Sequence, residues 1–201
     1  RKNLQNKYDK MANEVIEIPL IIGGREVRTE NQKQCVMPHD HRHVLGNFHL
    51  AGEDEVQLAI DSSMSAWKTY SKVSLEERTK IFRKAAELLQ GPWRDTINAA
   101  TMLNQSKNAF QAEIDAACEL IDFFNFNCQY AEDIHSNQPL ISPEGVKNSL
   151  EYRPLEGFVF AITPFNFTSI AANLPCAPAL MGNVSLWKPA SSAVLPCYYI
   201  M

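Results

Sequence analysis

The chain has 201 residues, of which 45% are hydrophobic and 21% charged, and its formal net charge is −4 at pH 7. This balance is typical of a globular protein with a substantial core. The acidic excess, without a basic stripe, argues against a nucleic-acid partner, and no apolar run is long enough to span a bilayer. The five cysteines are scattered and form no C-x-x-C pair, which argues against a zinc site or disulfide framework and favours a reducing compartment.

The first elements in chain order are short. Residues 1–14 are polar and predict a surface segment or a frayed helix. Residues 17–22 and 25–28 flank a Gly-Gly pair and predict a β-hairpin, because glycine accepts the positive φ angles of a two-residue turn. We expect residues 29–34 to form a polar loop and residues 35–37 to form a short strand.

A histidine-rich stretch follows at residues 38–43. His39, His41 and His43 alternate, so in a strand they would share one face and suggest a metal site. The adjacent Arg42 and the lack of a second ligand cluster weaken that interpretation. We favour an exposed polar loop without a metal.

Four helices are predicted at residues 52–73, 74–90, 93–104 and 109–134. The second begins with a capping box, in which Ser74 and the glutamate three residues later bond each other's backbone N–H groups. The positions expected to face the core are Val56, Ile60, Met64 and Trp67, then Ile81, Phe82, Ala85, Leu88 and Leu89, and in the fourth helix Phe110, Ile114, Ala117, Ile121, Phe124 and Cys128. We also interpret Phe123, Phe126, Tyr130 and Cys118 as core rather than as cofactor contacts.

Residues 136–148 contain two prolines and a glycine and predict irregular structure. Residues 149–153 alternate enough to predict a strand, which could form one arm of a ribbon with residues 138–141.

The last part of the chain predicts a β-α-β unit. Residues 158–162 are an apolar run expected to form a strand buried on both faces. Residues 170–181 predict the crossover helix, which Gly182-Asn183 ends, and residues 184–187 predict a second strand. The whole is interpreted as one α/β domain, in which a helical preamble precedes the first β-α-β unit of a Rossmann-like sheet.

The turn after the first of these strands lies where ligands bind in open α/β sheets. Asn166 offers an amide donor there, so it either caps the helix or stabilises an oxyanion or phosphate, and spacing leaves both open. Thr168 and Ser169 are alternative caps. Lys188 ends the second strand on the same edge and would suit ribose hydroxyls or phosphate, although a lone lysine is more often a solvated strand end. Cys176 lies in an apolar helix and is expected to be inert.

Neither a G-x-G-x-x-G nor a P-loop motif is present. Three other motifs, I-T-P-F-N-F-T at residues 162–168, P-A-L-M-G-N-V at 178–184 and L-W-K-P at 186–189, together resemble the aldehyde dehydrogenase superfamily. The stretches A-E-I-D-A-A-C-E-L-I-D-F-F-N-F-N at 112–127 and Y-R-P-L-E-G-F-V at 152–159 are similar to its 1-pyrroline-5-carboxylate dehydrogenases. The likeness extends from about residue 18 to residue 195.

The resemblance implies NAD-dependent oxidation of L-glutamate γ-semialdehyde to L-glutamate in proline catabolism, in the mitochondrial matrix of eukaryotes. It implies that Asn166 stabilises the oxyanion formed when a cysteine thiolate attacks the aldehyde. It assigns a backbone contact with the cofactor to Thr163 and the adenosine ribose to Lys188. Ser191 stands where many members have a glutamate that binds the ribose hydroxyls, which leaves the preference for NAD over NADP open.

The resemblance also implies a homo-oligomer, with residues 138–153 as the oligomerisation ribbon. It makes residues 1–201 the N-terminal part of the NAD-binding domain and places the nucleophilic cysteine, the general base and the catalytic domain after Met201. We therefore expect a portion of an enzyme that is inactive alone. The alternative is a truncated, non-catalytic isoform or paralogue that acts as an assembly partner.

Overall fold

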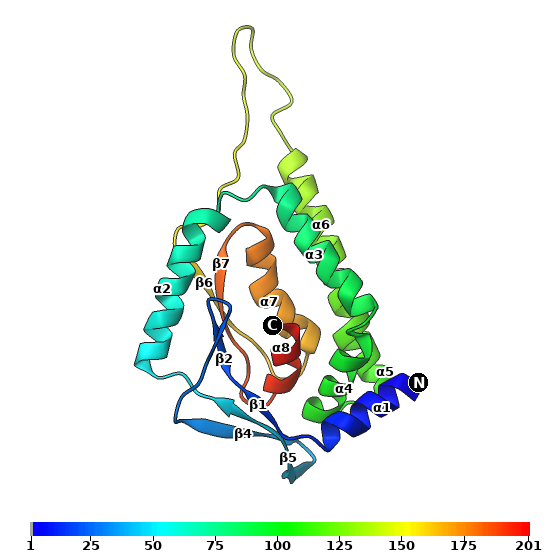
Figure 1. Ribbon diagram of the computed structural model, residues 1–201. Coiled ribbons are helices and arrows are strands. Elements are labelled where there is room, and N and C mark those ends of the chain that lie inside the picture. The colour runs from blue at the N-terminus through cyan, green and yellow to red at the C-terminus, as the bar shows by residue number, and fades with distance from the viewer. Residues whose placement is uncertain (1) are drawn as a thin grey trace.

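The computed structural model describes residues 2–201. Figure 1 shows helix α7 (Thr168–Leu180) in the middle of the molecule. Strands β6 (Phe158–Ile162) and β7 (Val184–Lys188) and helix α2 (Glu53–Tyr70) lie on one side of it, and helices α3 (Leu75–Gln90) and α6 (Leu120–Ser136) lie on the other. The two ends of this central helix position the groups considered below.

The predicted β-α-β unit is confirmed. Strands β6 and β7 are parallel, with Phe158 opposite Val184 and Ile162 opposite Lys188. The C-terminal end of α7 is a Schellman turn, in which Asn183 N donates to Pro178 O at 3.0 Å and Gly182 has φ +90°. The predicted stop at these two residues is therefore also correct.

The expectation that the first of these strands is buried on both faces is wrong. Ala161 is buried, whereas Phe158, Phe160 and Ile162 on the opposite face are 38%, 57% and 64% exposed. Helix α7 covers one face of the two-stranded sheet, and α2 packs mainly against β7 on the other. An apolar strip of β6 is thereby left open.

The N-terminal region contains helix α1 (Lys2–Ala12) and a three-stranded sheet in the order β1-β5-β4. Strand β1 (Ile16–Ile18) is parallel to β5 (Asp40–His49), and β4 (Gln32–Met37) is antiparallel to β5. Residues 32–34 and 40–43, which were expected to be loop, are thus strand. The loop prediction failed because successive polar residues in each stretch are exposed on both faces of the sheet, which removes the alternating pattern of a half-buried strand.

The Gly-Gly hairpin is confirmed. It joins β2 (Leu20–Ile22) to β3 (Arg25–Val27), and Gly23 and Gly24 have φ angles of +58° and +74°.

The predicted helices exist. Besides α2 and α3 they are α4 (Arg94–Gln105), α5 (Ala109–Ala112), the π-helical segment η1 (Glu113–Glu119) and α6, and α8 (Val194–Ile200) ends the chain. The capping box of α3 is present, since Glu77 N donates to Ser74 Oγ at 3.2 Å and Ser74 N donates to the Glu77 carboxylate at 3.3 Å.

Several side chains expected in the core are exposed instead. In the long helix the reason is η1, whose wider turns shift the buried face, so that Phe110 and Ile114 point outward while Ala116, Ala117 and Leu120 are buried. The other exposed members of the expected faces are Val56, Ile81, Leu88, Phe126, Tyr130 and Cys118. Phe126 and Tyr130 stack on each other outside the core.

Residues 137–157 form an arm that projects from the end of α6 (Figure 1). The predicted strand at residues 149–153 is absent from it. Gln138 holds the two sides together through its amide, which donates to Leu150 O at 3.3 Å and accepts from Leu150 N at 2.9 Å. These side-chain bonds replace a ladder of backbone bonds. None of the helices in residues 2–201 is both long and apolar enough to cross a membrane.

Candidate active site

Residues 163–167 connect β6 to the start of α7, at the carboxyl edge of the sheet. Thr163 N donates to Lys188 O at 3.2 Å, so the structure places these two predicted cofactor residues side by side. The Thr163 side chain is buried, and its hydroxyl accepts from Trp187 Nε1 at 2.9 Å. A ligand at this edge would therefore meet the backbone of Thr163 and the exposed side chain of Lys188.

Asn166 lies in the same loop and is exposed. Its amide makes no hydrogen bond within residues 2–201, so the helix-cap interpretation is wrong for this residue. The interpretations of Thr168 and Ser169 as caps are wrong as well, because both lie inside α7. The amide of Asn166 is left available to a ligand.

The N-terminal end of α7 is capped from another helix. Asp115, in η1, accepts hydrogen bonds from Thr168 N and Ser169 N, each at 3.0 Å, and from Ser169 Oγ at 2.8 Å. The Asp115 side chain is 4% exposed. A carboxylate at this position satisfies the free N–H groups of the first turn and complements the helix dipole.

Lys107 lies beneath the loop, in the connection between α4 and α5. Its Nζ is 2.7 Å from Asp115 Oδ2 and donates to Asn166 O at 2.5 Å. The same atom is 4.6 Å from the centre of the Phe167 ring. The side chain is 16% exposed, so the ion pair is largely shielded from water.

Sequence reasoning missed both Lys107 and Asp115. The only available signal was an acidic residue inside an alanine-rich apolar stretch, where an unpaired charge would be costly. Nearby, Glu113 accepts from Arg94 and, at 2.5 Å, from Asn98 Nδ2. The Arg94 guanidinium holds the pKa of the Glu113 carboxyl below its ordinary value. A second, partly exposed ion pair therefore supports η1.

The cysteines offer no activated thiol at this loop. Burial raises the pKa of Cys176 to about 12, as predicted for an inert thiol. Burial likewise raises the pKa of Cys35 to about 11 and that of Cys197 to about 12. The expectation that Cys118 is buried is wrong, because it is exposed beside Arg94, where the π-helical turns direct it outward.

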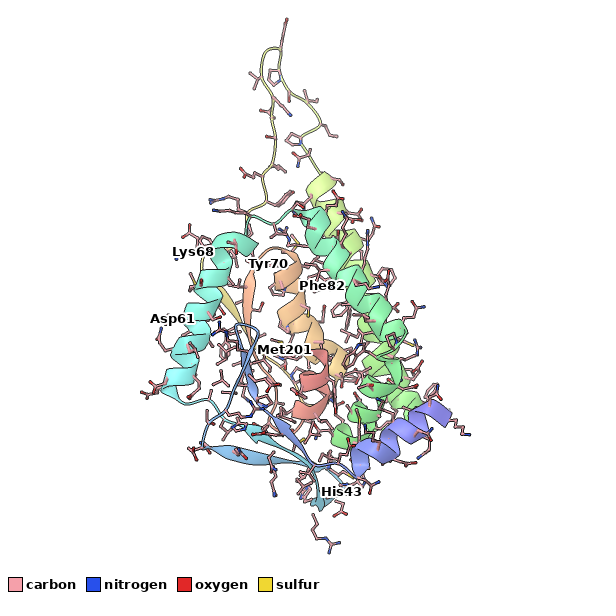
Figure 2. The ribbon with its side chains drawn as sticks, in the orientation of Figure 1. His43, Asp61, Lys68, Tyr70, Phe82 and Met201 are labelled. Carbon is pink, nitrogen blue, oxygen red and sulfur yellow. The ribbon has the colours of Figure 1, made fainter. Side chains whose placement is uncertain are left out.

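The histidine-rich stretch lies in β5 and in the turn before it, and Figure 2 shows His43 at the lower edge of the molecule. His43 Nε2 is 2.6 Å from Ala12 O, and His39 Nδ1 is 2.6 Å from Ser106 Oγ. Residues 2–201 contain no group of three or more potential metal-ligating side chains. These two histidines instead connect β5 and its turn to neighbouring helices.

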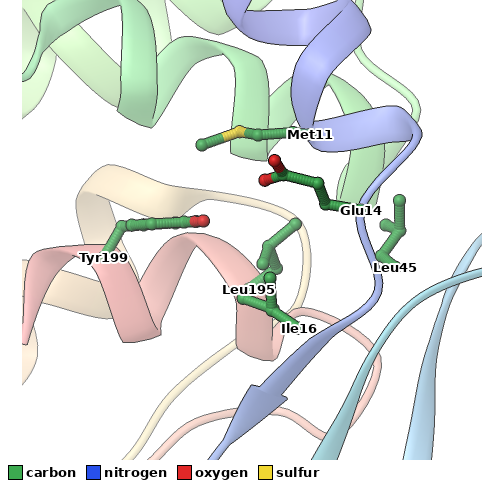
Figure 3. A pocket seen from close by; sticks show the side chains of 6 residues that line it. All are labelled: Met11, Glu14, Ile16, Leu45, Leu195 and Tyr199. Atoms are coloured by element: carbon green, nitrogen blue, oxygen red, sulfur yellow. The ribbon is translucent and has the colours of Figure 1, made fainter.

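One small cavity is enclosed by Met11, Glu14, Ile16, Leu45, Leu195 and Tyr199 (Figure 3). Its volume is about 10 Å³, which is room for a single water molecule. None of the candidate site residues lines it.

The model of the aldehyde dehydrogenase family matches residues 26–201. The chain belongs to the aldehyde dehydrogenase family. It is 48% identical over 195 residues to the mitochondrial delta-1-pyrroline-5-carboxylate dehydrogenase of Dictyostelium discoideum, a match that covers 97% of the chain and 35% of the relative. The human mitochondrial delta-1-pyrroline-5-carboxylate dehydrogenase is 44% identical over 200 residues, which cover 100% of the chain and 35% of that protein.

Solved aldehyde dehydrogenase structures confirm the α/β fold. The delta-pyrroline-5-carboxylate dehydrogenase of Mycobacterium tuberculosis bound with NAD matches with a TM-score of 0.98 and 48% identity. That match covers 100% of this chain and 38% of the other. The chain thus spans about a third of the length of the relatives it matches, and it corresponds to an N-terminal portion of them.

Proposed function

We propose that residues 1–201 belong to an NAD-dependent 1-pyrroline-5-carboxylate dehydrogenase, called the full-length enzyme below, and form the N-terminal part of its NAD-binding domain. Its reaction would be the oxidation of L-glutamate γ-semialdehyde to L-glutamate in proline catabolism. The observation that carries this proposal is the loop at the sheet edge, where the amide of Asn166 is free while its backbone is held. Pyrroline-5-carboxylate dehydrogenases that match 97% or more of the chain support the substrate.

Asn166 is proposed to donate its amide N–H to the oxyanion that forms when a thiolate attacks the aldehyde carbon. The thiolate and the general base would come from the part of the full-length enzyme after residue 201. A donor fixed before the reaction stabilises the developing charge without reorganisation. The loop suits this role, because its backbone is bonded to buried groups while Asn166 itself stays exposed.

The residues at the sheet edge fit a dinucleotide. The backbone of Thr163 and the exposed ammonium of Lys188 are adjacent, and Lys188 forms no ion pair within residues 2–201. Lys188 would bind the adenosine ribose, and the backbone of Thr163 would contact the cofactor. NAD, when bound, supplies the hydride acceptor. The NAD-bound relative from Mycobacterium tuberculosis supports NAD as the cofactor.

The two roles predict opposite kinetic effects in the full-length enzyme. Asn166→Ala should lower kcat by about 10²–10³-fold, the usual cost of losing one oxyanion donor, and leave the KM for NAD nearly unchanged. Lys188→Ala should mainly raise the KM for NAD. Steady-state NADH formation with L-glutamate γ-semialdehyde measures both. Exchanged phenotypes would refute the role assignments, and a wild-type enzyme without this activity would refute the proposed reaction.

Residues 138–153, which lie within the arm, are proposed to mediate homo-oligomerisation. Leu140 and Ile141 are 101% and 81% exposed, a cost in water that a second subunit would remove. Leu140→Asp together with Ile141→Asp should lower the assembly state in sedimentation analysis. Lys147 is exposed, and Lys147→Asp serves as a control for added negative charge on the same arm.

A mitochondrial location is proposed because the Dictyostelium and human relatives carry that designation.

A further inference from the structure

The side chain of Lys107 reaches the backbone of the loop that carries the proposed oxyanion donor. Lys107 lies two residues before the start of α5, and its ammonium contacts three groups: the Asp115 carboxylate at 2.7 Å, the Asn166 carbonyl at 2.5 Å and the face of Phe167 at 4.6 Å. An ammonium carries three donors and no acceptor, so it can serve a carboxylate and a carbonyl together.

Asp115 does not need Lys107 to satisfy its oxygens. The carboxylate already accepts from Thr168 N at one oxygen and from Ser169 N at the other, while the single Ser169 hydroxyl proton lies between Asp115 Oδ1 at 2.8 Å and Glu119 Oε2 at 2.5 Å. The ion pair balances its charge. The bond from Lys107 to Asn166 O has a separate effect, because it fixes the backbone of the loop to a largely buried ammonium group.

The contacts fix three consecutive residues. Lys107 holds the carbonyl of Asn166 and packs against the ring of Phe167, while Asp115 holds the N–H of Thr168. The peptide group that joins Asn166 to Phe167 is therefore restrained at its oxygen and at the following side chain. The direction in which Asn166 presents its free amide depends on that restraint.

We propose that Lys107 is a positioning residue for Asn166, acting through the Asn166 carbonyl and its ion pair with Asp115. The proposal rests on the proposed function of Asn166. Misplacing a catalytic group by about 1 Å costs on the order of 10²-fold in rate. Lys107 therefore contributes to kcat without touching substrate or cofactor.

The test uses the full-length enzyme. Lys107→Met keeps the stem and removes the charge, and it should lower kcat by about 10–100-fold while both KM values change little. Lys107→Arg retains a charged donor and should recover most of this loss. Arg78→Met is the matched control, since it removes the cation that bonds the other end of α7, at Leu180 O, and should leave kcat unchanged.

Lys107→Met leaves a buried carboxylate without its cation, a cost that can by itself prevent folding. The double variant Lys107→Met/Asp115→Asn removes both charges and retains an acceptor for the helix end. It should fold and still show the lowered kcat, because Asn166 O has lost its donor. Amide hydrogen exchange of residues 163–169 gives a readout that does not need turnover, and it should be faster in both variants than in wild type or Arg78→Met.

Unchanged exchange in this segment would overturn the proposal, whatever the rates. The proposal would also be overturned if the Lys107 variants showed faster amide exchange in residues 163–169 but kept the wild-type kcat. If the wild-type enzyme does not oxidise the semialdehyde but exchange is faster in the variants, the positioning of the loop stands and the proposed function falls.

Discussion

The two ends of α7 are held by side chains of opposite charge. At the N-terminal end, Asp115 accepts from the N–H groups of Thr168 and Ser169. At the C-terminal end, Arg78 Nε donates to Leu180 O at 2.7 Å, and Tyr70 Oη donates to Ala179 O at 3.0 Å (Figure 2 labels Tyr70). Both arrangements satisfy groups that a helix leaves free and complement its dipole.

The ends differ in what lies beyond them. At the C-terminal end Gly182 is buried, and a Cβ there would come within 2.7 Å of Pro154 Cγ, so the turn is closed by packing. At the N-terminal end Phe165 is 65% exposed and Asn166 is exposed as well. Both ends are anchored, but only the N-terminal one is open to a ligand. The contacts at the N-terminal end of α7 therefore position a candidate site, whereas those at the C-terminal end serve folding alone.

The largest expected effect is at the open end. Asp115→Ala removes the cap of α7 and leaves the ammonium of Lys107, 16% exposed, without its counter-ion. Breaking a buried pair from one side costs about 3–5 kcal/mol. Urea denaturation of the full-length enzyme should show a clearly lower midpoint. Asp115→Asn, which keeps an acceptor, should lose less, and equal losses would mean that capping does not matter here.

A smaller effect is expected at the closed end. Arg78 is 5% exposed, and within residues 2–201 no carboxylate pairs with it. Arg78→Met should cost about 1–3 kcal/mol, because the Leu180 carbonyl is left without a donor. The same denaturation experiment measures it. A change in kcat as large as that of Asn166→Ala would contradict the separation of the two ends.

The smallest expected effect concerns the ion pair between Arg94 and Glu113, which supports η1 near the N-terminal end of α7. The pKa of Glu113 is lowered by Arg94, so this pair stabilises the fold above the ordinary glutamate pKa, and the contribution disappears as pH falls through the lowered value. Both side chains are about one-third exposed, which screens the interaction to within about 1 kcal/mol. Denaturation midpoints of wild type and Glu113→Gln should therefore converge under acid conditions. A difference that grew with acidity would contradict the assignment.

Elements with a local signature could be predicted from the sequence. The Gly-Gly turn, the capping box at Ser74 and the stop at Gly182 each depend on neighbouring residues, and all three are present. The β-α-β unit follows from an apolar strand, a helix and a second strand in succession. Asn166 and Lys188 were singled out by their positions at the carboxyl edge of the predicted strands, and the family resemblance supplied their roles and added Thr163. The structure brings Thr163 and Lys188 together.

The groups that hold the site could not be predicted in this way. Asp115 bonds residues 53 and 54 positions away, and Lys107 bonds a carbonyl 59 positions away. No periodicity encodes such partners. The exposed face of β6 was missed for a related reason, because burial depends on what packs over a strand and not on the strand's own composition.

The π-helical segment η1 has a further consequence when it is considered as an insertion. A π-turn is equivalent to one extra residue in an α-helix, and each residue turns the helix by about 100°. The wider turns absorb that extra residue, so deleting one residue between Glu113 and Glu119 would restore a regular α-helix without rotating the helical residues on either side against each other. Asp115 and Lys107 lie in or before this segment, whereas Phe124 is packed after it. Such a deletion would displace Asp115, which lies inside η1 and caps α7, while Lys107 and Phe124 on either side of the segment would keep their positions.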